Sequence, residues 1–294
     1  MGQSIKCSSE NILKLIIEKG GRAEDLWTRD IAGTSIPILE ILLEHGWNIN
    51  YRGPHWDPMP FMWHIVEHDD IVAWCLEHGA SVFLNKNGYA YHHGACPEIL
   101  EKAAQYATVS TFELLRSKGA PLGWRPLHLA VEQAVLLSAS RVQVEAKGNN
   151  EKTNEKRATL ARKYSERMAM VRHLIDVIGV DVNALDRPDG RRTQNYVAGN
   201  ALCYVAQCYG FPDGLNSEEL VWFLLDRGAD PAAALVEAKG VDNPEFLQDV
   251  QAWKENARPS WSKRALRYWP SWLSRQPTTS HDRAADCSEH QEKT

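Results

Sequence analysis

The sequence predicts an all-α protein, an α-solenoid in which pairs of helices stack on one another. A short apolar phrase that ends in glycine recurs along the chain, and its apolar residues have the i, i+3, i+4 spacing typical of one buried helical face. A second, weaker phrase precedes some copies and indicates a shorter first helix. Because a lone helix pair cannot bury its apolar face, we expect the pairs to gain their core from neighbours.

The glycine-ended phrase occurs six times. Each glycine can adopt the left-handed backbone conformation that terminates a helix. The copies are ILKLIIEKG, ILEILLEHG, IVAWCLEHG, TFELLRSKG, MVRHLIDVIG and LVWFLLDRG, ending at Gly20, Gly46, Gly79, Gly119, Gly179 and Gly228. Short polar segments such as NIN after Gly46 and DVN after Gly179 then lead the chain out of the helix.

The first-helix phrase carries a more specific signal. It reads MPFMWHIVEHD at 59–69, RPLHLAVEQA at 125–134 and NALCYVAQCYG at 200–210. RPLHLA matches the ankyrin motif T-P-L-H-x-A except at its first position, and the step from Gly46 to Gly79 is the ankyrin period of 33 residues.

Over about residues 11–238 the sequence therefore resembles the ankyrin repeat family, in a degenerate form with insertions. The other steps between glycines are irregular and range from 26 to 60 residues. The resemblance implies a curved stack of helix pairs with projecting hairpin fingers, and it implies no particular chemistry.

The sequence divides into an ankyrin-like repeat domain at 1–240, a Trp-rich C-terminal helical cap at 241–276 and a disordered polar tail at 277–294. Within the repeats, residues 138–169 form an insertion with helical spacing on both sides of KGNN, which is a turn signal. We expect an antiparallel helical hairpin there. It is either an arm that docks a partner or a solvated insertion stabilised by its own stripe of apolar residues and by charge pairs.

Composition narrows the class of partner. The net charge of −5 gives no overall basic field that would attract nucleic acid. No apolar run approaches the ~18 residues that a membrane-spanning helix needs, and the N-terminal MGQSIKCSSE lacks a signal-peptide apolar region. The 6 scattered cysteines are predicted to be reduced thiols. We therefore expect a cytoplasmic or nuclear protein.

One segment allows contact with a membrane surface. Arg258–Arg275 carries basic residues, no acidic residue and three interleaved tryptophans. Such a segment can lie on an anionic membrane. The alternative is a capping helix whose aromatic residues pack on the last repeat while its arginines face solvent.

Two histidine motifs raise the question of a metal site. His64, Glu67 and His68 fit H-x-x-E-H, the pattern of an inverted zinc peptidase. That chemistry needs one continuous helix to hold both histidines on one face. Alignment on Gly79 instead places His64 inside a first helix and His68 at its exit, so we expect no metal here.

The second motif, YHHGAC, offers His92, His93 and Cys96 as ligands, but a closed zinc site needs a fourth. We expect a polar finger loop. No phosphate-binding or nucleophile motif occurs, and we expect neither a cofactor nor a catalytic residue. A dispersed Ser–His–Asp triad stays open, because triads are recognised by geometry.

The candidate binding residues lie in the fingers. The finger after Gly46 is stiffened by Pro54, Pro58 and Pro60. Aromatic and arginine side chains of this kind anchor interfaces. The candidates are Tyr51, Arg52, His55, Trp56, Tyr89, Trp124 and Arg125. For Trp56, packing against the next finger is an equally open alternative.

The sequence thus favours a non-catalytic protein-binding module or scaffold that uses fingers and inner helices. The alternative is a small-molecule-binding protein or unusual enzyme with an aromatic pocket on the concave face, such as an accessory protein of a biosynthetic pathway. A closed Trp-lined cavity with convergent His or Asp would favour the alternative, and an open groove would favour the binding module.

Overall fold

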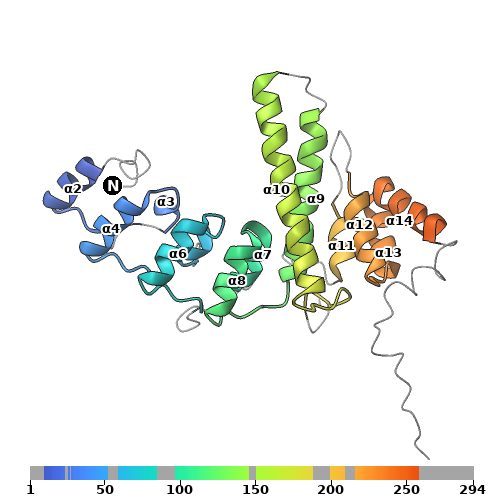
Figure 1. Cartoon of the computed structure of the whole chain (residues 1–294), viewed down its shortest axis with the longest axis horizontal. Coiled ribbons are helices and arrows are strands. Elements are labelled where there is room, and N and C mark those ends of the chain that lie inside the picture. Colours follow the sequence, from blue (N-terminus) through green and yellow to red (C-terminus); the bar gives the residue numbers. More distant parts are fainter. Residues whose placement is uncertain are drawn as a thin grey trace, which may run out of the picture. The chain divides into compact units, whose positions relative to one another are not determined.

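The computed structural model of the chain describes residues 10–23, 26, 28–51, 59–84, 97–145, 150–187, 199–208 and 216–257. The secondary-structure elements of these residues are helices, labelled in Figure 1. They are α2 (Glu10–Glu18), α3 (Thr28–Ile31), α4 (Ile36–Glu44), α5 (Phe61–His64), α6 (Asp69–Glu77), α7 (Ile99–Tyr106), α8 (Val109–Ser117), α9 (Pro126–Glu145), α10 (Glu151–Asp176), α11 (Ala201–Ala206), α12 (Glu218–Asp226), α13 (Ala232–Val241) and α14 (Pro244–Ala257). The predicted all-α class is confirmed for the described part of the chain.

The six glycines that end the repeated phrase all have the left-handed backbone conformation. Their φ angles lie between 79° and 91°. After five of them the next residue donates its N–H to the carbonyl five positions earlier, the longer bond of the Schellman motif. These bonds are Gly21–Ile16, Trp47–Leu42, Ala80–Cys75, Ala120–Leu115 and Ala229–Leu224. The prediction that each phrase is a helix terminated by its glycine is therefore confirmed.

Two loops that follow these glycines are built alike. The amide of Asn50 donates to the carbonyl of Gly79 at 3.0 Å, and its oxygen accepts the N–H of Ser81 at 2.7 Å. Asn183 makes the same two bonds, donating to the carbonyl of Gly228 at 2.9 Å and accepting the N–H two residues further on at 2.7 Å. Each asparagine therefore ties its own loop to the next one.

Helices contact their counterparts in neighbouring pairs. Among the first helices, α3 packs against α5, α7 against α9, α9 against α11 and α11 against α13. Among the second helices, α2 packs against α4, α6 against α8 and α8 against α10. One apolar cluster extends through the described residues from Leu13 to Val250. The cluster includes buried apolar residues of the helices from α2 to α14.

The long helices α9 and α10 lie side by side where the sequence predicted a helical hairpin at 138–169 (Figure 1). Helix α9 begins before residue 138, and helix α10 ends after residue 169. Before Tyr164, side chains of α10 are exposed or half-buried, and from Tyr164 onward one face is buried. Arg167 is buried and donates to the carbonyls of Ala104 and Ala107, where α7 ends. The base of the hairpin is thereby fixed to α7.

A further pair of helices, α13 and α14, follows the last predicted copy. α13 packs against α11. The indole N–H of Trp253 in α14 donates to the carboxylate of Asp226 at 3.0 Å, and the indole of Trp222 donates to the carbonyl of Asp249 at 3.1 Å. These bonds join α14 to α12.

The chain divides into two compact units, 1–253 and 254–294, and the boundary lies within α14. The helices from α2 to α13 belong to the first unit. The basic Trp segment Arg258–Arg275 and the predicted tail 277–294 lie outside the described residues, so both stay predictions.

Candidate functional site

The structure describes three of the predicted binding residues. Tyr51 is 38% exposed and Trp124 is 58% exposed, so both rings are accessible at the surface. Arg125, directly after Trp124, is only 7% exposed. The candidates outside the described residues are Arg52, His55, Trp56 and Tyr89.

The backbone that carries Trp124 is held by a buried carboxylate. Glu101 of α7 accepts the N–H of Trp124 at 2.9 Å and that of Arg125 at 2.7 Å. Gly123 has a φ of 75°, and a Cβ there would lie 2.5 Å from the Cγ of Glu101. Only glycine fits both requirements. Trp124 is therefore presented to solvent from a fixed turn.

Arg125 acts inside the protein. Burial raises the pKa of the Glu132 carboxyl, and the charge of Arg125 partly opposes that rise. The same charge contributes to lowering the pKa of His128, for which burial is the larger cause. Trp124 and Arg125 are adjacent in one predicted site, but Trp124 faces solvent and Arg125 is buried.

Three exposed aromatic side chains follow consecutive helix-ending glycines, and we call them the loop edge: Tyr51, Phe83 and Trp124. Phe83 is 57% exposed, and its ring lies over Gly119, where a Cβ would be 3.8 Å from its Cζ. Asn50 ties the loop of Tyr51 to the loop that leads to Phe83. The three loops are therefore neighbours. Phe83 was missed as a candidate, although it stands four residues after its glycine, close to the offset of Tyr51.

The H-x-x-E-H residues lie on separate helices. His64 is the last residue of α5, and His68 immediately precedes α6. The predicted helix break between them is confirmed. Glu67 lies in the turn and is close to Lys163, with 3.8 Å between Oε2 and Nζ.

In the part of the chain that the structure describes, no three His, Cys, Asp or Glu side chains gather as a metal-binding group. His92, His93 and Cys96 lie outside that part. The thiols of Cys75 and Cys208 are free, and that of Cys203 lies 3.5 Å from the Oδ1 of Asn200.

Burial raises the pKa of Cys75 and of Cys208 to about 12, so both stay protonated and weakly nucleophilic at neutral pH.

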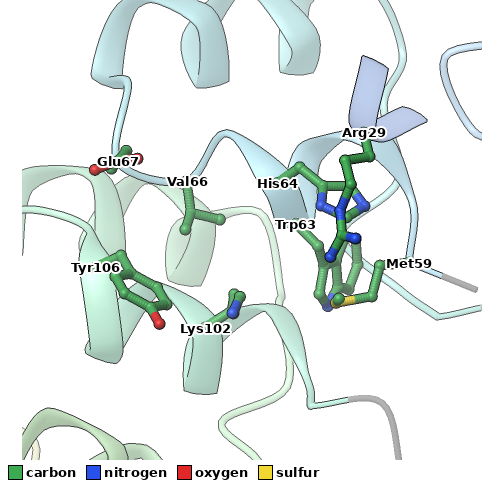
Figure 2. A pocket seen from close by; sticks show the side chains of 8 residues that line it. All are labelled: Arg29, Met59, Trp63, His64, Val66, Glu67, Lys102 and Tyr106. Atoms are coloured by element: carbon green, nitrogen blue, oxygen red, sulfur yellow. The ribbon is translucent and has the colours of Figure 1, made fainter. Parts of the chain in front are cut away.

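A cavity of about 230 Å³ opens between α3, α5 and α7. Figure 2 shows the side chains around it, which combine cationic, aromatic and apolar groups. They belong to Arg29, Met59, Trp63, His64, Val66, Glu67, Lys102 and Tyr106. No sequence pattern marks this site, because its cations come from segments more than seventy residues apart. Its lining includes a tryptophan and a histidine, and the alternative small-molecule function stays a prediction.

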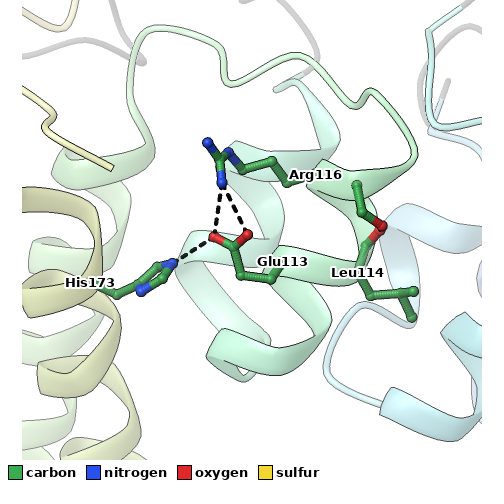
Figure 3. A network of polar contacts seen from close by, with 5 residues as sticks. Glu113, Leu114, Arg116 and His173 are labelled. Carbon is green, nitrogen blue, oxygen red and sulfur yellow. Dashed lines mark hydrogen bonds and ion pairs between the residues drawn. The ribbon is translucent and has the colours of Figure 1, made fainter. Parts of the chain in front are cut away.

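A polar network joins α8 to α10 (Figure 3). The carboxylate of Glu113 accepts from the Nε2 of His173 at 2.6 Å and from Arg116 at 3.0 Å. The bond from His173, followed by that from Arg116, holds the pKa of Glu113 below its usual range. The carboxylate stays ionised at neutral pH, and the network links the hairpin to the preceding pair.

No family model matches the chain, and no curated protein sequence matches it. Among the helices formed by the described residues, none is both long and apolar enough to cross a membrane.

Proposed function

We propose that the chain is a non-catalytic protein-binding module, an ankyrin-type α-solenoid that holds a partner with its loops and inner helices. The repeated loop bonds of Asn50 and Asn183, together with the contacts between successive helix pairs, support the stacked arrangement. The buried free thiol of Cys75 fits a reducing compartment such as the cytoplasm or nucleus.

The loop edge is the observation that carries the proposal. Tyr51, Phe83 and Trp124 expose large apolar surface, which is costly to hydrate and gains free energy when a partner covers it. Tryptophan and tyrosine are the side chains most enriched among interface hot spots. The bonds from Glu101 and Asn50 fix two of the loops, so little backbone freedom remains to be lost on binding.

Trp124→Ala is the decisive variant. If the loop edge is the hot spot, the variant binds the partner more weakly by about 2 kcal/mol or more. The partner is identified by affinity capture from native cells with quantitative mass spectrometry, and its affinity is then measured with purified proteins. Phe83→Ala tests the neighbouring loop in the same way.

Val236→Ala is the matched control, because Val236 is 71% exposed and belongs to α13, outside the three loops that carry the loop edge. Melting temperatures show whether each variant stays folded. Equal affinity of the Trp124, Phe83 and Val236 variants would move the binding surface away from the loop edge.

The cavity between α3, α5 and α7 favours a second candidate, a small-molecule-binding protein. Its volume of about 230 Å³ lies below the ~300–1,000 Å³ of most ligand pockets. The small size places this function second.

A further inference from the structure

Helix α9 packs against α7 and α11, and one side of it stays accessible. On this side Glu132, Gln133 and Ser140 are half-buried, and Leu136 is 38% exposed. Glu132 and Leu136 are one helical turn apart, so their side chains are neighbours on the helix surface. The accessible side of α9 therefore places a carboxylate next to an apolar side chain.

The carboxylate of Glu132 makes no hydrogen bond or ion pair in the part of the chain that the structure describes. Burial raises its pKa, and the charge of Arg125 partly opposes that rise. Arg125 is itself only 7% exposed. Glu132 has thus lost part of its hydration without gaining hydrogen-bond donors in exchange, which leaves its carboxylate open to a cationic group from outside.

Tyr106 of α7 extends this surface. Burial raises the pKa of Tyr106, and the charges of Glu132 and Glu67 raise it further, so Tyr106 and Glu132 lie near each other. Tyr106 is 39% exposed, and Lys102 lies over its ring, with 4.5 Å from Nζ to the centroid. A partner that reaches Glu132 therefore meets aromatic and aliphatic surface beside it.

We propose that the surface formed by Glu132, Leu136 and Tyr106 binds an arginine of the protein partner together with an apolar side chain next to that arginine. This inference rests on the proposed binding function and names the chemistry that the inner helices recognise. The guanidinium pairs with Glu132, and the apolar side chain covers Leu136. Arginine suits a half-buried carboxylate, because its planar guanidinium is weakly hydrated and can donate two parallel hydrogen bonds. One carboxylate supplies too few ligands for a metal ion.

Peptides test the inference directly. The full chain, with its leucine methyl groups labelled for NMR, is titrated with acetyl-Leu-Arg-Leu-amide and with the same peptide carrying citrulline, a neutral isostere of arginine. We expect the arginine peptide to bind in the millimolar range, read at the methyl groups of Leu136. The citrulline peptide should bind about tenfold more weakly, because it lacks the charge-assisted bond. Acetyl-Gly-Arg-Gly-amide should also bind more weakly, because nothing apolar covers Leu136.

Glu132→Gln completes a double-mutant cycle. We expect this variant to bind the arginine and citrulline peptides equally, with the affinity that wild type has for the citrulline peptide. Glu145→Gln is the matched control, because Glu145 is an exposed carboxylate at the end of the same helix, and it should leave both affinities unchanged. Since burial raises the pKa of Glu132, its ionised form is disfavoured in the folded protein. Glu132→Gln should therefore melt at the same or a higher temperature than wild type.

Four results would overturn the inference: equal binding of the arginine and citrulline peptides to wild type, binding of neither, equal binding of the leucine and glycine peptides, or a Glu132→Gln variant that still prefers arginine. A clear fall in the melting temperature of Glu132→Gln would also reject it, because the carboxylate would then hold the fold.

The captured partner separates this inference from the proposed function. If Trp124→Ala weakens its binding and Glu132→Gln does not, the inference fails and the proposed function stands. If Glu132→Gln weakens its binding and Trp124→Ala does not, the inner helices bind the partner and the loop edge does not.

Discussion

At the scale of single residues, His128 joins separate segments of the chain. Its Nε2–H donates to the carbonyls of Ala184 and Gly199, each at 3.1 Å. The ring is 1% exposed, and burial lowers its pKa to about 4. His128 is therefore neutral in the folded protein, and its proton stays on the nitrogen that makes both bonds.

Acid should weaken the fold through His128. The unfolded chain takes up a proton at this residue below its ordinary pKa near 6.5, and the folded protein does so only near 4. Stability is therefore lost as pH falls through this window. We expect the stability advantage of wild type over His128→Gln in urea unfolding to shrink by about 2 kcal/mol from pH 7 to pH 5.

His45→Gln provides the comparison, because His45 is exposed and its ring bonds to the carbonyl of Ile41 within its own helix end. The stability of both variants is measured against wild type at the same two pH values, and we expect the larger change with pH for His128→Gln. A constant gap between wild type and His128→Gln at both pH values would show that the ring is not buried in its neutral form.

Single residues also mark a limit of sequence reasoning. Trp124 and Arg125 are neighbours in an aromatic, basic pair that is typical of interfaces, yet one is exposed and the other buried. Glu101 fixes the backbone of both residues, because it accepts both of their N–H groups from a helix more than twenty residues away. Such a contact leaves no local pattern in the sequence.

At the scale of helices, the apolar spacing predicted most of the structure. The apolar residues around KGNN predicted two long helices, and α9 and α10 are present there. The predicted insertion at 138–169 did not reach the ends of α9 and α10, because each helix runs unbroken from the core into the projecting part. A continuous helix has no Gly or Pro signal at the point where it leaves the core.

Replacing Arg141–Arg162 with a short Gly/Ser linker should leave a folded protein. In this range Val144 is the one fully buried apolar side chain among the described residues, so little core is lost. Tyr164 and Arg167 remain, and Arg167 keeps its bonds to the end of α7. We expect cooperative thermal unfolding, measured by circular dichroism, with a modestly lower melting temperature.

Arg167→Met in the full chain is the contrasting variant. It leaves the buried carbonyls of Ala104 and Ala107 without their donor, which costs about 3 kcal/mol. If the shortened hairpin lost more stability than Arg167→Met, or unfolded without cooperativity, the projecting part would belong to the core.

At the scale of the whole molecule, the sequence predicts where the helices end and the loops begin, but it does not predict the cavity. Helix ends are local, so glycines such as Gly46 and Gly228 marked them correctly. The cavity needs Arg29, His64 and Lys102 to meet, and only the packing of three helices brings them together. Local patterns therefore predicted the elements, while the site depends on contacts distant in the chain.

The proposed stack of helix pairs should open from its ends. Helix α9 packs against α7, α10, α11 and α12, whereas α2, the first described helix, packs against α4. Stability in such a stack is a sum of terms between neighbours, so end pairs open at lower free energy than central ones. Hydrogen exchange in low urea, read by mass spectrometry, should be slowest in α7, α9 and the buried part of α10. Exchange should be faster in α2 and α4.

Leu13→Ala tests whether the effect stays local. Leu13 is fully buried in α2, and its truncation removes about 2–5 kcal/mol from the terminal pair. We expect faster exchange in α2 and α4 and unchanged exchange in α12 and α13. Phe246→Ala in α14 should give the opposite pattern, with faster exchange in α12 and α13 and unchanged exchange in α2 and α4. Phe246 is fully buried at the opposite end of the described helices. If Leu13→Ala accelerated exchange equally in α2 and α13, the unit would unfold as one block, and the stacked interpretation would fail.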